Sequence, residues 1–314
     1  MPLTPEEKTV ESRLMPWRFW FLVILSVFLF VTFVLYMPVR FLHKSSLSSA
    51  AMPQFQLNVI TPQPLAAGIP QELSIELKDD KGQPLTDLRI VHERLVHVVI
   101  IDEELETLGH VHPEDLGSVS DEMKAQGRFV VQYTFPKPGR EYIVAVDGNH
   151  RGTHSFALHQ RVRTEGEAPP ANIIKDLGQS KSFGDYTVSL ATTPGIIKSG
   201  EPVTFRYRFE KGGQPVRDFE QYLGAPMHVS VVSAELETFV HTHGEVHDPN
   251  TGVLVSNPTR FGPDIDAHIV FPHPGLYRIF GQVNHDGKVW ATSFMVSVAL
   301  GKQAPGAMPM GHAH

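Results

Sequence analysis

Histidine is the residue type through which this sequence could do chemistry. The 314-residue chain contains 17 histidines and no cysteine, which excludes disulfides, thiolate metal sites and cysteine nucleophiles. Two H-x-H pairs stand out: His110 with His112, and His241 with His243. On a β-strand, residues i and i+2 point to the same face about 6.5–7 Å apart, so the two imidazoles of a pair could reach one ion.

A third histidine precedes each pair by the same distance along the chain. His97 and His228 each stand 13 residues before the first histidine of their pair. A hairpin that turns at Glu103–Glu104 would place His97 across from Val111, beside the first pair, and a turn about Glu235 would do the same in the second copy. Three imidazoles on two paired strands can hold Zn²⁺ or Cu²⁺. The sequence therefore predicts two three-histidine metal sites, which we expect to bind independently: His97, His110, His112 and His228, His241, His243.

A structural role is the alternative for these histidines, because a strand histidine flanked by valines often serves only as a hydrogen-bonding residue. The metal hypothesis is favoured because the whole triplet occurs twice at the same spacing while neighbouring positions differ. Val96 corresponds to Met227, and Leu108 corresponds to Phe239. Shared ancestry of the two copies could preserve part of the pattern, so both interpretations stay open here.

The C-terminal segment carries a second potential set of ligands. It reads GKQAPGAMPMGHAH, and residues 300–314 are expected to form a flexible tail. Thioethers select Cu(I), whereas imidazoles also suit Cu(II) and zinc, so copper is the predicted metal and zinc the alternative. The turn residues His150 and His285 could each add a further ligand. The candidate tail ligands are Met308, Met310, His312 and His314.

An internal repeat indicates which elements position the histidines. The segment Gly82–His112 aligns with Gly213–His243, and FPKPG and NHRG downstream of the first match FPHPG and NHDG downstream of the second. A period this long indicates a duplicated domain. The copies are expected at residues 54–163 and 183–299, joined by a polar, proline-bearing linker over residues 164–182.

Short alternating runs predict the fold class of both copies. LSIEL and VTFRYRF alternate apolar and polar residues, HVVII and HVSVV consist almost wholly of β-formers, and Gly, Pro and Asp separate such runs. About seven strands in ~110 residues is typical of an immunoglobulin-like sandwich. The prediction is an all-β protein with two tandem immunoglobulin-like β-sandwich domains, preceded by one transmembrane helix.

That helix is predicted over Phe19–Val39, which contains no charged residue. Its 21 residues match the roughly 30 Å of a bilayer's hydrocarbon core. Three basic residues precede it and two follow closely, so residues 1–18 are expected in the cytoplasm and the two domains outside it.

Two pairs of motifs resemble the YtkA-like domain. They are HVSVVSAELETFVHTH with FPHPGLY, and HVVIIDEELETLGHVHPE with FPKPGREY. That family is similar in architecture to the CopC-like copper-resistance sandwiches of the bacterial envelope. The resemblance implies an immunoglobulin-like fold, an envelope location and, loosely, copper or heavy-metal handling. Together with the predicted helix, it leads us to expect a single-pass protein of the bacterial inner (plasma) membrane with its domains in the periplasm. A CopC-type site uses the free N-terminal histidine of the mature protein, which has no counterpart here.

These features favour two functional hypotheses. The first is a membrane-anchored extracytoplasmic metal-binding protein that stores, delivers or confers tolerance to copper. The second is a non-metal scaffold or assembly subunit of a membrane protein complex. A net charge of -7 without a long basic run argues against nucleic-acid binding. The sequence shows no nucleophile elbow, H-E-x-x-H or phosphate loop, so no enzymatic activity is predicted.

Overall fold

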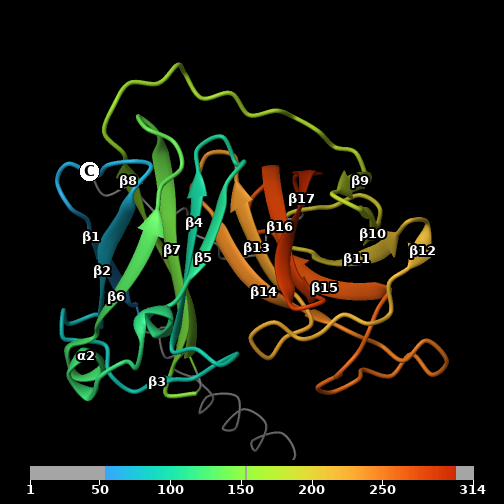
Figure 1. Cartoon of the computed structure of the whole chain (residues 1–314), viewed down its shortest axis with the longest axis horizontal. Coiled ribbons are helices and arrows are strands. Elements are labelled where there is room, and N and C mark those ends of the chain that lie inside the picture. Colours follow the sequence, from blue (N-terminus) through green and yellow to red (C-terminus); the bar gives the residue numbers. More distant parts are fainter. Residues whose placement is uncertain (1–53, 153, 302–314) are drawn as a thin grey trace, which may run out of the picture. The chain divides into compact units, whose positions relative to one another are not determined.

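The computed structural model describes residues 54–152 and 154–301, and this part of the chain is all-β (Figure 1). Strands of the first repeat are β1 (Gln56–Ile60), β2 (Pro70–Lys78), β3 (Leu88–Arg89), β4 (Val96–Asp102), β5 (Leu108–Val111), β6 (Arg128–Thr134), β7 (Glu141–His150) and β8 (His154–Arg163). Strands of the second are β9 (Ser180–Phe183), β10 (Tyr186–Thr193), β11 (Pro202–Lys211), β12 (Gln214–Pro215), β13 (His228–Ser233), β14 (Phe239–Glu245), β15 (Asp264–Val270), β16 (Gly275–His285) and β17 (Lys288–Val298).

Each repeat is an antiparallel sandwich of the immunoglobulin-like kind. In the first repeat, β1-β2-β6 form one sheet and β8-β7-β4-β5 the other, with β3 paired to the end of β7. In the second, β9-β10-β11-β15 correspond to the first layer and β17-β16-β13-β14 to the second. The two layers are linked there because the end of β14 also pairs with β15.

Separate apolar cores lie inside the two sandwiches. The first repeat buries the rings of Phe129, Phe135 and Tyr142 among aliphatic side chains. A second core contains Tyr207 and Phe219 with their neighbours. Alternating strands such as β2 and β11 turn one face to these cores and the other to solvent, as expected for the outer layer of a sandwich.

The inner layers differ, because β4 and β13 are buried along their whole length. One face of each strand packs into its own sandwich, and the other face packs against the other repeat. A third apolar cluster joins the repeats there: Val99, Ile101, Leu105, Ile143 and Ala145 from the first, and Val232, Leu236, Phe239, Phe280 and Met295 from the second. The two repeats therefore keep separate cores and are packed sheet to sheet.

Two elements differ from the sequence prediction. Strand β9 begins at Ser180, inside the predicted linker, because Ser180–Phe183 pairs with β10. A short helix α2 (Asp121–Gln126), preceded by the 3₁₀ turn η1 (Pro113–Leu116), was not predicted and lies between β5 and β6. Ser120 caps α2 by accepting from the Met123 amide, and Gly127 ends it in the left-handed conformation.

Two predicted segments lie outside the described residues: the transmembrane helix 19–39 and the Met/His tail, of which only residues 300 and 301 are described. In the part of the chain that is described, no helix has the length and apolar character needed to cross a membrane.

Candidate metal centre

The histidine triplets lie on the faces of β4–β5 and β13–β14 that meet between the repeats. Val99 pairs with His110 across the first hairpin, so His110 shares its face with Val99 and with His97 two residues before it. In the second hairpin, His228 pairs directly with His243. The predicted register, with His97 across from Val111, is wrong by one residue, since Val98 holds that place. The expected register would have turned His97 to the opposite face from His110.

The first triplet brings three ring nitrogens to one point. His97 Nδ1 lies 3.1 Å from His110 Nε2 and 3.2 Å from His112 Nε2, and the latter two nitrogens are 3.1 Å apart. A triangle of this size has its centre about 1.8 Å from each corner, so an ion slightly out of its plane would sit at the ~2.0–2.1 Å distance of a zinc or copper imidazole bond. The fourth tetrahedral position would then stay open.

The hydrogen bonds on the opposite ring nitrogens fix the tautomer of each imidazole. His97 Nε2 is 3.2 Å from the Val91 carbonyl, and His112 Nδ1 is 3.2 Å from Asp115 Oδ2. His110 Nδ1 is 2.7 Å from Gln282 Oε1. Carbonyl, carboxylate and amide oxygens only accept hydrogen bonds. Each of these three ring nitrogens therefore carries the proton of its imidazole. Three lone pairs therefore face one another, an unfavourable arrangement that a cation at their centre would stabilise.

The second triplet repeats this plan more loosely. His228 Nε2 donates to the Tyr222 carbonyl at 3.0 Å, and His228 Nδ1 lies 3.4 Å from His241 Nε2. His243 Nε2 is buried without a hydrogen-bond partner. One ligand atom from each of His228, His241 and His243 falls within 4.8 Å of the others. These three imidazoles are therefore potential ligands of one ion.

Each triplet is oriented by a side chain of the other repeat. His110 Nδ1 donates to Gln282, and His241 Nδ1 donates to Asp147 Oδ1 at 2.7 Å. Asp147 and Gln282 occupy the same place in the two repeats, two residues before the asparagine of the NHxG motif. They also sit opposite His97 and His228 on the neighbouring strands β7 and β16. The repeats therefore exchange hydrogen bonds across a local pseudo-twofold relation.

The two triplets are also close to each other. His97 and His110 both have a ring nitrogen within 4.8 Å of one in His228. Between the repeats, the ring centroids of His97 and His228 are 5.5 Å apart, and those of His110 and His241 are 5.6 Å apart. The six imidazoles, which we call the histidine cluster, thus form one group and not two distant sites.

Burial keeps five imidazoles of this cluster neutral by lowering their pKa values. Desolvation lowers the pKa of His97 to about 4, and it also lowers the pKa values of His110, His112, His228 and His243. Charged neighbouring histidines add to the effect at His110 and His228. Neutral imidazole is the form that ligates a metal, so these five histidines can bind an ion at neutral pH without first losing a proton.

His92 is a further member of the site that sequence reasoning missed. Its ring lies 3.7 Å from that of His243, centroid to centroid, and 5.7 Å from that of His228. His92 precedes β4 in the first repeat, yet it contacts the triplet of the second. Its counterpart by the repeat offset is Leu223, so the comparison of the copies that revealed the triplets could not reveal His92.

The other candidate ligands lie in different surroundings. His285 is hydrogen-bonded to the Tyr186 hydroxyl at 2.6 Å and to Asp218 at 2.9 Å, and His150 packs edge-on against Phe55. Both contact residues outside the histidine cluster, which agrees with a structural role at the strand ends. The tail residues Met308, Met310, His312 and His314 lie outside the described part of the chain.

Asp102, Glu104 and Glu106 form another compact set of oxygen ligands. The ammonium group of Lys137 already lies 2.7 Å from a carboxylate oxygen of each. The positive charge that such a group attracts is thus supplied by the protein, and the set offers no comparable cation site.

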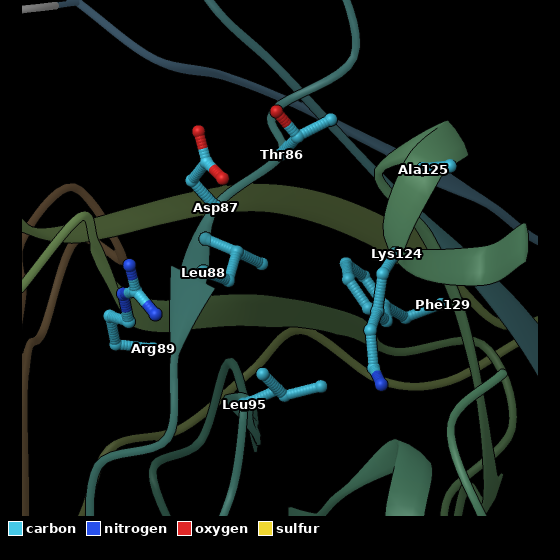
Figure 2. Close-up of a pocket in the computed structure, with 8 residues that line it drawn as sticks. All are labelled: Thr86, Asp87, Leu88, Arg89, Leu95, Lys124, Ala125 and Phe129. Atoms are coloured by element: carbon cyan, nitrogen blue, oxygen red, sulfur yellow. The ribbon is translucent and has the colours of Figure 1, made fainter. Parts of the chain in front are cut away.

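Two cavities bear on access. One of about 380 Å³ borders the histidine cluster and is lined by residues of both repeats, including His92, His97, His243 and Asp147. The other, of about 410 Å³, is lined by residues near β3 and α2, with Leu88, Leu95 and Phe129 among them (Figure 2). No member of the histidine cluster lines this second cavity. The first cavity therefore offers an ion or a small ligand a way to the cluster.

The chain shows only distant likeness to the solved structures compared. The two-domain fibronectin type III segment of chicken tenascin is 12% identical, with a TM-score of 0.21, and the match covers 78% of this chain and 100% of that one. InvD of Yersinia pseudotuberculosis is 16% identical, with a TM-score of 0.24, 81% of this chain and 60% of that chain covered. A methylamine-reacted Salmonella alpha-2-macroglobulin is 11% identical, with a TM-score of 0.22. That match covers 77% of this chain and 16% of the macroglobulin chain. No curated protein matches the sequence.

One family model matches both repeats, at residues 54–164 and 181–299. The match confirms the tandem repeat, and the matched segments begin and end within two residues of the predicted copies. The chain therefore belongs to the family described as a domain of unknown function, DUF8832, and carries that domain twice.

Proposed function

We propose that this protein is an extracytoplasmic metal-binding protein, anchored in the membrane by Phe19–Val39, whose histidine cluster binds copper for storage, delivery or tolerance. The observation that carries the proposal is the convergence of three imidazole lone pairs within 3.1–3.2 Å of one another. A purely structural triplet would be expected to place a proton between two of these nitrogens. Here each proton is instead held on the far side of its ring by an oxygen acceptor.

Copper is favoured over zinc by ligand chemistry. An all-imidazole site suits both metals, but Cu²⁺ binds such ligands more tightly in the general order of divalent-metal affinity. The methionines at positions 308 and 310 add thioethers, which prefer Cu(I). The resemblance to the YtkA-like domain and to the CopC-like sandwiches points the same way, as does the absence of cysteine from the sequence.

Metal analysis of the full chain, purified in detergent, tests this proposal. The metal-free protein is titrated with Cu(II), with Cu(I) under reducing conditions and with Zn(II), and bound metal is measured after gel filtration. We expect tight copper binding, and we expect the number of copper ions bound per chain to fall in a variant carrying His97→Asn, His110→Asn and His112→Asn, which keeps only the second triplet. His268→Gln serves as the control, since His268 is an exposed histidine outside the cluster that contacts Thr204 and Glu245. Absence of stoichiometric metal from the native protein would leave the scaffold hypothesis as the better one.

The tail and the membrane anchor have separate tests. A chain that ends at Gly301 should bind less Cu(I) but should keep the tight Cu(II) binding of the histidine cluster. A reporter fused after His314 should be active only outside the cytoplasm if Phe19–Val39 spans the membrane with residues 1–18 inside. A reporter active in the cytoplasm would overturn the envelope location.

A further inference from the structure

We infer that the histidine cluster forms a single two-metal centre shared by the repeats, in which His92 is an additional ligand of the second ion. This inference rests on the proposed function and specifies how many ions bind, how they interact and how the two halves differ. The first half consists of His97, His110 and His112, and the second of His228, His241, His243 and His92.

Proximity is the first argument. Ring nitrogens of His97 and His110 approach one of His228 to within 4.8 Å. With metal–nitrogen bonds of ~2 Å, ions held by the two triplets would lie about 3–6 Å apart, a range that includes the ~3.5–4 Å of known two-metal sites. Two ions about 3.5–4 Å apart would share one solvent molecule or anion as a bridging ligand. Bridged ions would differ from separate ones in their magnetic properties.

Charge balance is the second argument. The ligands of the cluster are imidazoles, which bring no negative charge, so two Cu(II) ions would repel each other in a buried setting. One carboxylate lies behind each half: Asp115 is bonded to His112, and Asp147 to His241. A bridging hydroxide derived from water would add the negative charge needed directly between the ions, and the adjoining cavity of about 380 Å³ gives water a route to that place.

The third argument is that the two halves differ at one matched position. His92 and Leu223 correspond in the repeats and have the same left-handed backbone conformation, with φ of 49° and 48°. The two loops thus follow the same course and differ in side chain. The ring of His92 contacts that of His243 at an interplanar angle of 32°, whereas the first half has a leucine in the corresponding place. The second ion would then have four imidazoles available, and the first only three with an open position for the bridging ligand.

Copper titration followed by electron paramagnetic resonance tests the two-metal centre. We expect the full chain to bind two Cu(II) ions at the cluster. We also expect the integrated spin signal to rise with the first equivalent and fall below two spins per chain with the second, because bridged Cu(II) ions couple magnetically. The chain ending at Gly301 is used alongside, so that tail copper is not counted.

Three other outcomes of the copper titration would contradict the two-metal centre. Two copper ions with a full two-spin signal and no dipolar broadening would mean separate sites and would overturn the inference. One ion per chain would also overturn it while leaving the proposed function standing. No bound copper or zinc would overturn both.

A matched pair of variants tests the role of His92. His92→Leu gives the second half the residue that the first half has, and Leu223→His does the reverse. We expect His92→Leu to weaken binding of one ion by about 10–100-fold without changing the other, and to shift its copper spectrum toward fewer nitrogen ligands. Leu223→His should shift the spectrum of the other ion in the opposite direction. Unchanged affinities and spectra in His92→Leu, with the fold intact by circular dichroism, would remove His92 from the centre.

Discussion

Every imidazole of the first triplet has one ring nitrogen hydrogen-bonded to an oxygen and the other directed at its neighbours. Such oxygen partners orient a ligating histidine and raise its basicity, and their loss typically costs 10–100-fold in metal affinity. In this chain, one partner of each triplet comes from the other repeat. Asp147 serves the second triplet, and Gln282 serves the first.

Changing the charge of these two partners should change the metal affinities of the two triplets in opposite directions. Gln282→Glu places a carboxylate behind His110 and should tighten metal binding at the first triplet. Asp147→Asn keeps an acceptor for His241 but removes the charge, so it should weaken binding at the second by about tenfold or more. Competition titrations with a chelator of known affinity measure both. Equal effects on the two triplets, or none, would contradict the exchanged arrangement.

Proton uptake by the buried histidines should make the metal-free protein sensitive to acid. The pKa of His97 falls to about 4 on folding, from an ordinary value of 6.5, because burial disfavours the charged ring. Between these values the unfolded chain binds a proton that the folded chain does not, so stability falls as pH decreases from 6.5 toward 4. His110, His112, His228 and His243 have pKa shifts of the same sign.

Thermal unfolding of metal-free protein across this pH range measures the effect. We expect the melting temperature to fall steadily below pH 6.5, and to fall less in His228→Asn, which removes one of the shifted groups. A melting temperature that is flat from pH 6.5 to pH 4 would show that these imidazoles are protonated or solvated in the folded state.

At the scale of elements, β14 has little room for change near its histidines. A methyl group on Gly244 would lie 2.6 Å from Ile265 Cγ2 and 2.8 Å from Met227 Cβ, both in the core of the second repeat. Gly244→Ala should therefore destabilise the protein by about 1–3 kcal/mol, as overpacking does, and should move His243 and weaken metal binding. Chemical denaturation measures the first effect, with Gly195→Ala as the control because nothing lies within 4 Å of its added methyl group. Equal stability of the two variants would contradict this account.

The strands and the duplication were predictable from sequence, and the hairpin register was not. Alternation and the repeated motifs predicted the all-β fold and both repeats correctly. The register depends on the loop between β4 and β5, where the Asp102 carboxylate accepts the amides of Glu106 and Thr107, and Leu105 adopts a left-handed conformation. Between β13 and β14, the Ser233 hydroxyl accepts the amides of Glu237 and Thr238, and Leu236 is left-handed. Leucine gives no sign in a sequence that it will take a positive φ.

The sequence does contain one indication that the repeats are in contact. HVVII and HVSVV lack alternation, and a strand without a polar face needs apolar or buried partners on both sides. One sandwich supplies only one of them. His92 gave no signal of this kind, because it lies in a loop and its counterpart in the second copy is Leu223 and not a histidine.

At the scale of the whole described chain, the repeats should melt as one unit. Ten buried apolar side chains join them, and Ile143 is fully buried in that cluster. Ile143→Ala should cost about 2–5 kcal/mol and should lower a single calorimetric transition. Two resolved transitions, with only one of them moved by the substitution, would show that the repeats unfold independently.

The same interface should hold the repeats together when the chain between them is cut. Residues 171–179 have no regular structure and are mostly exposed, so a site for a specific protease inserted between Lys175 and Asp176 should be accessible. After cleavage the two halves should co-elute in gel filtration, because the apolar cluster and the bonds from Asp147 and Gln282 do not depend on the linker. Bound copper should elute with the two associated halves. Removing the copper with a chelator should weaken the association of the halves, since ions held by histidines of both repeats add to the interface. As a control, the cut Ile143→Ala protein should separate at a lower denaturant concentration than the cut parent. Immediate separation of the parent halves would mean that the linker, and not the interface, holds the two histidine triplets together.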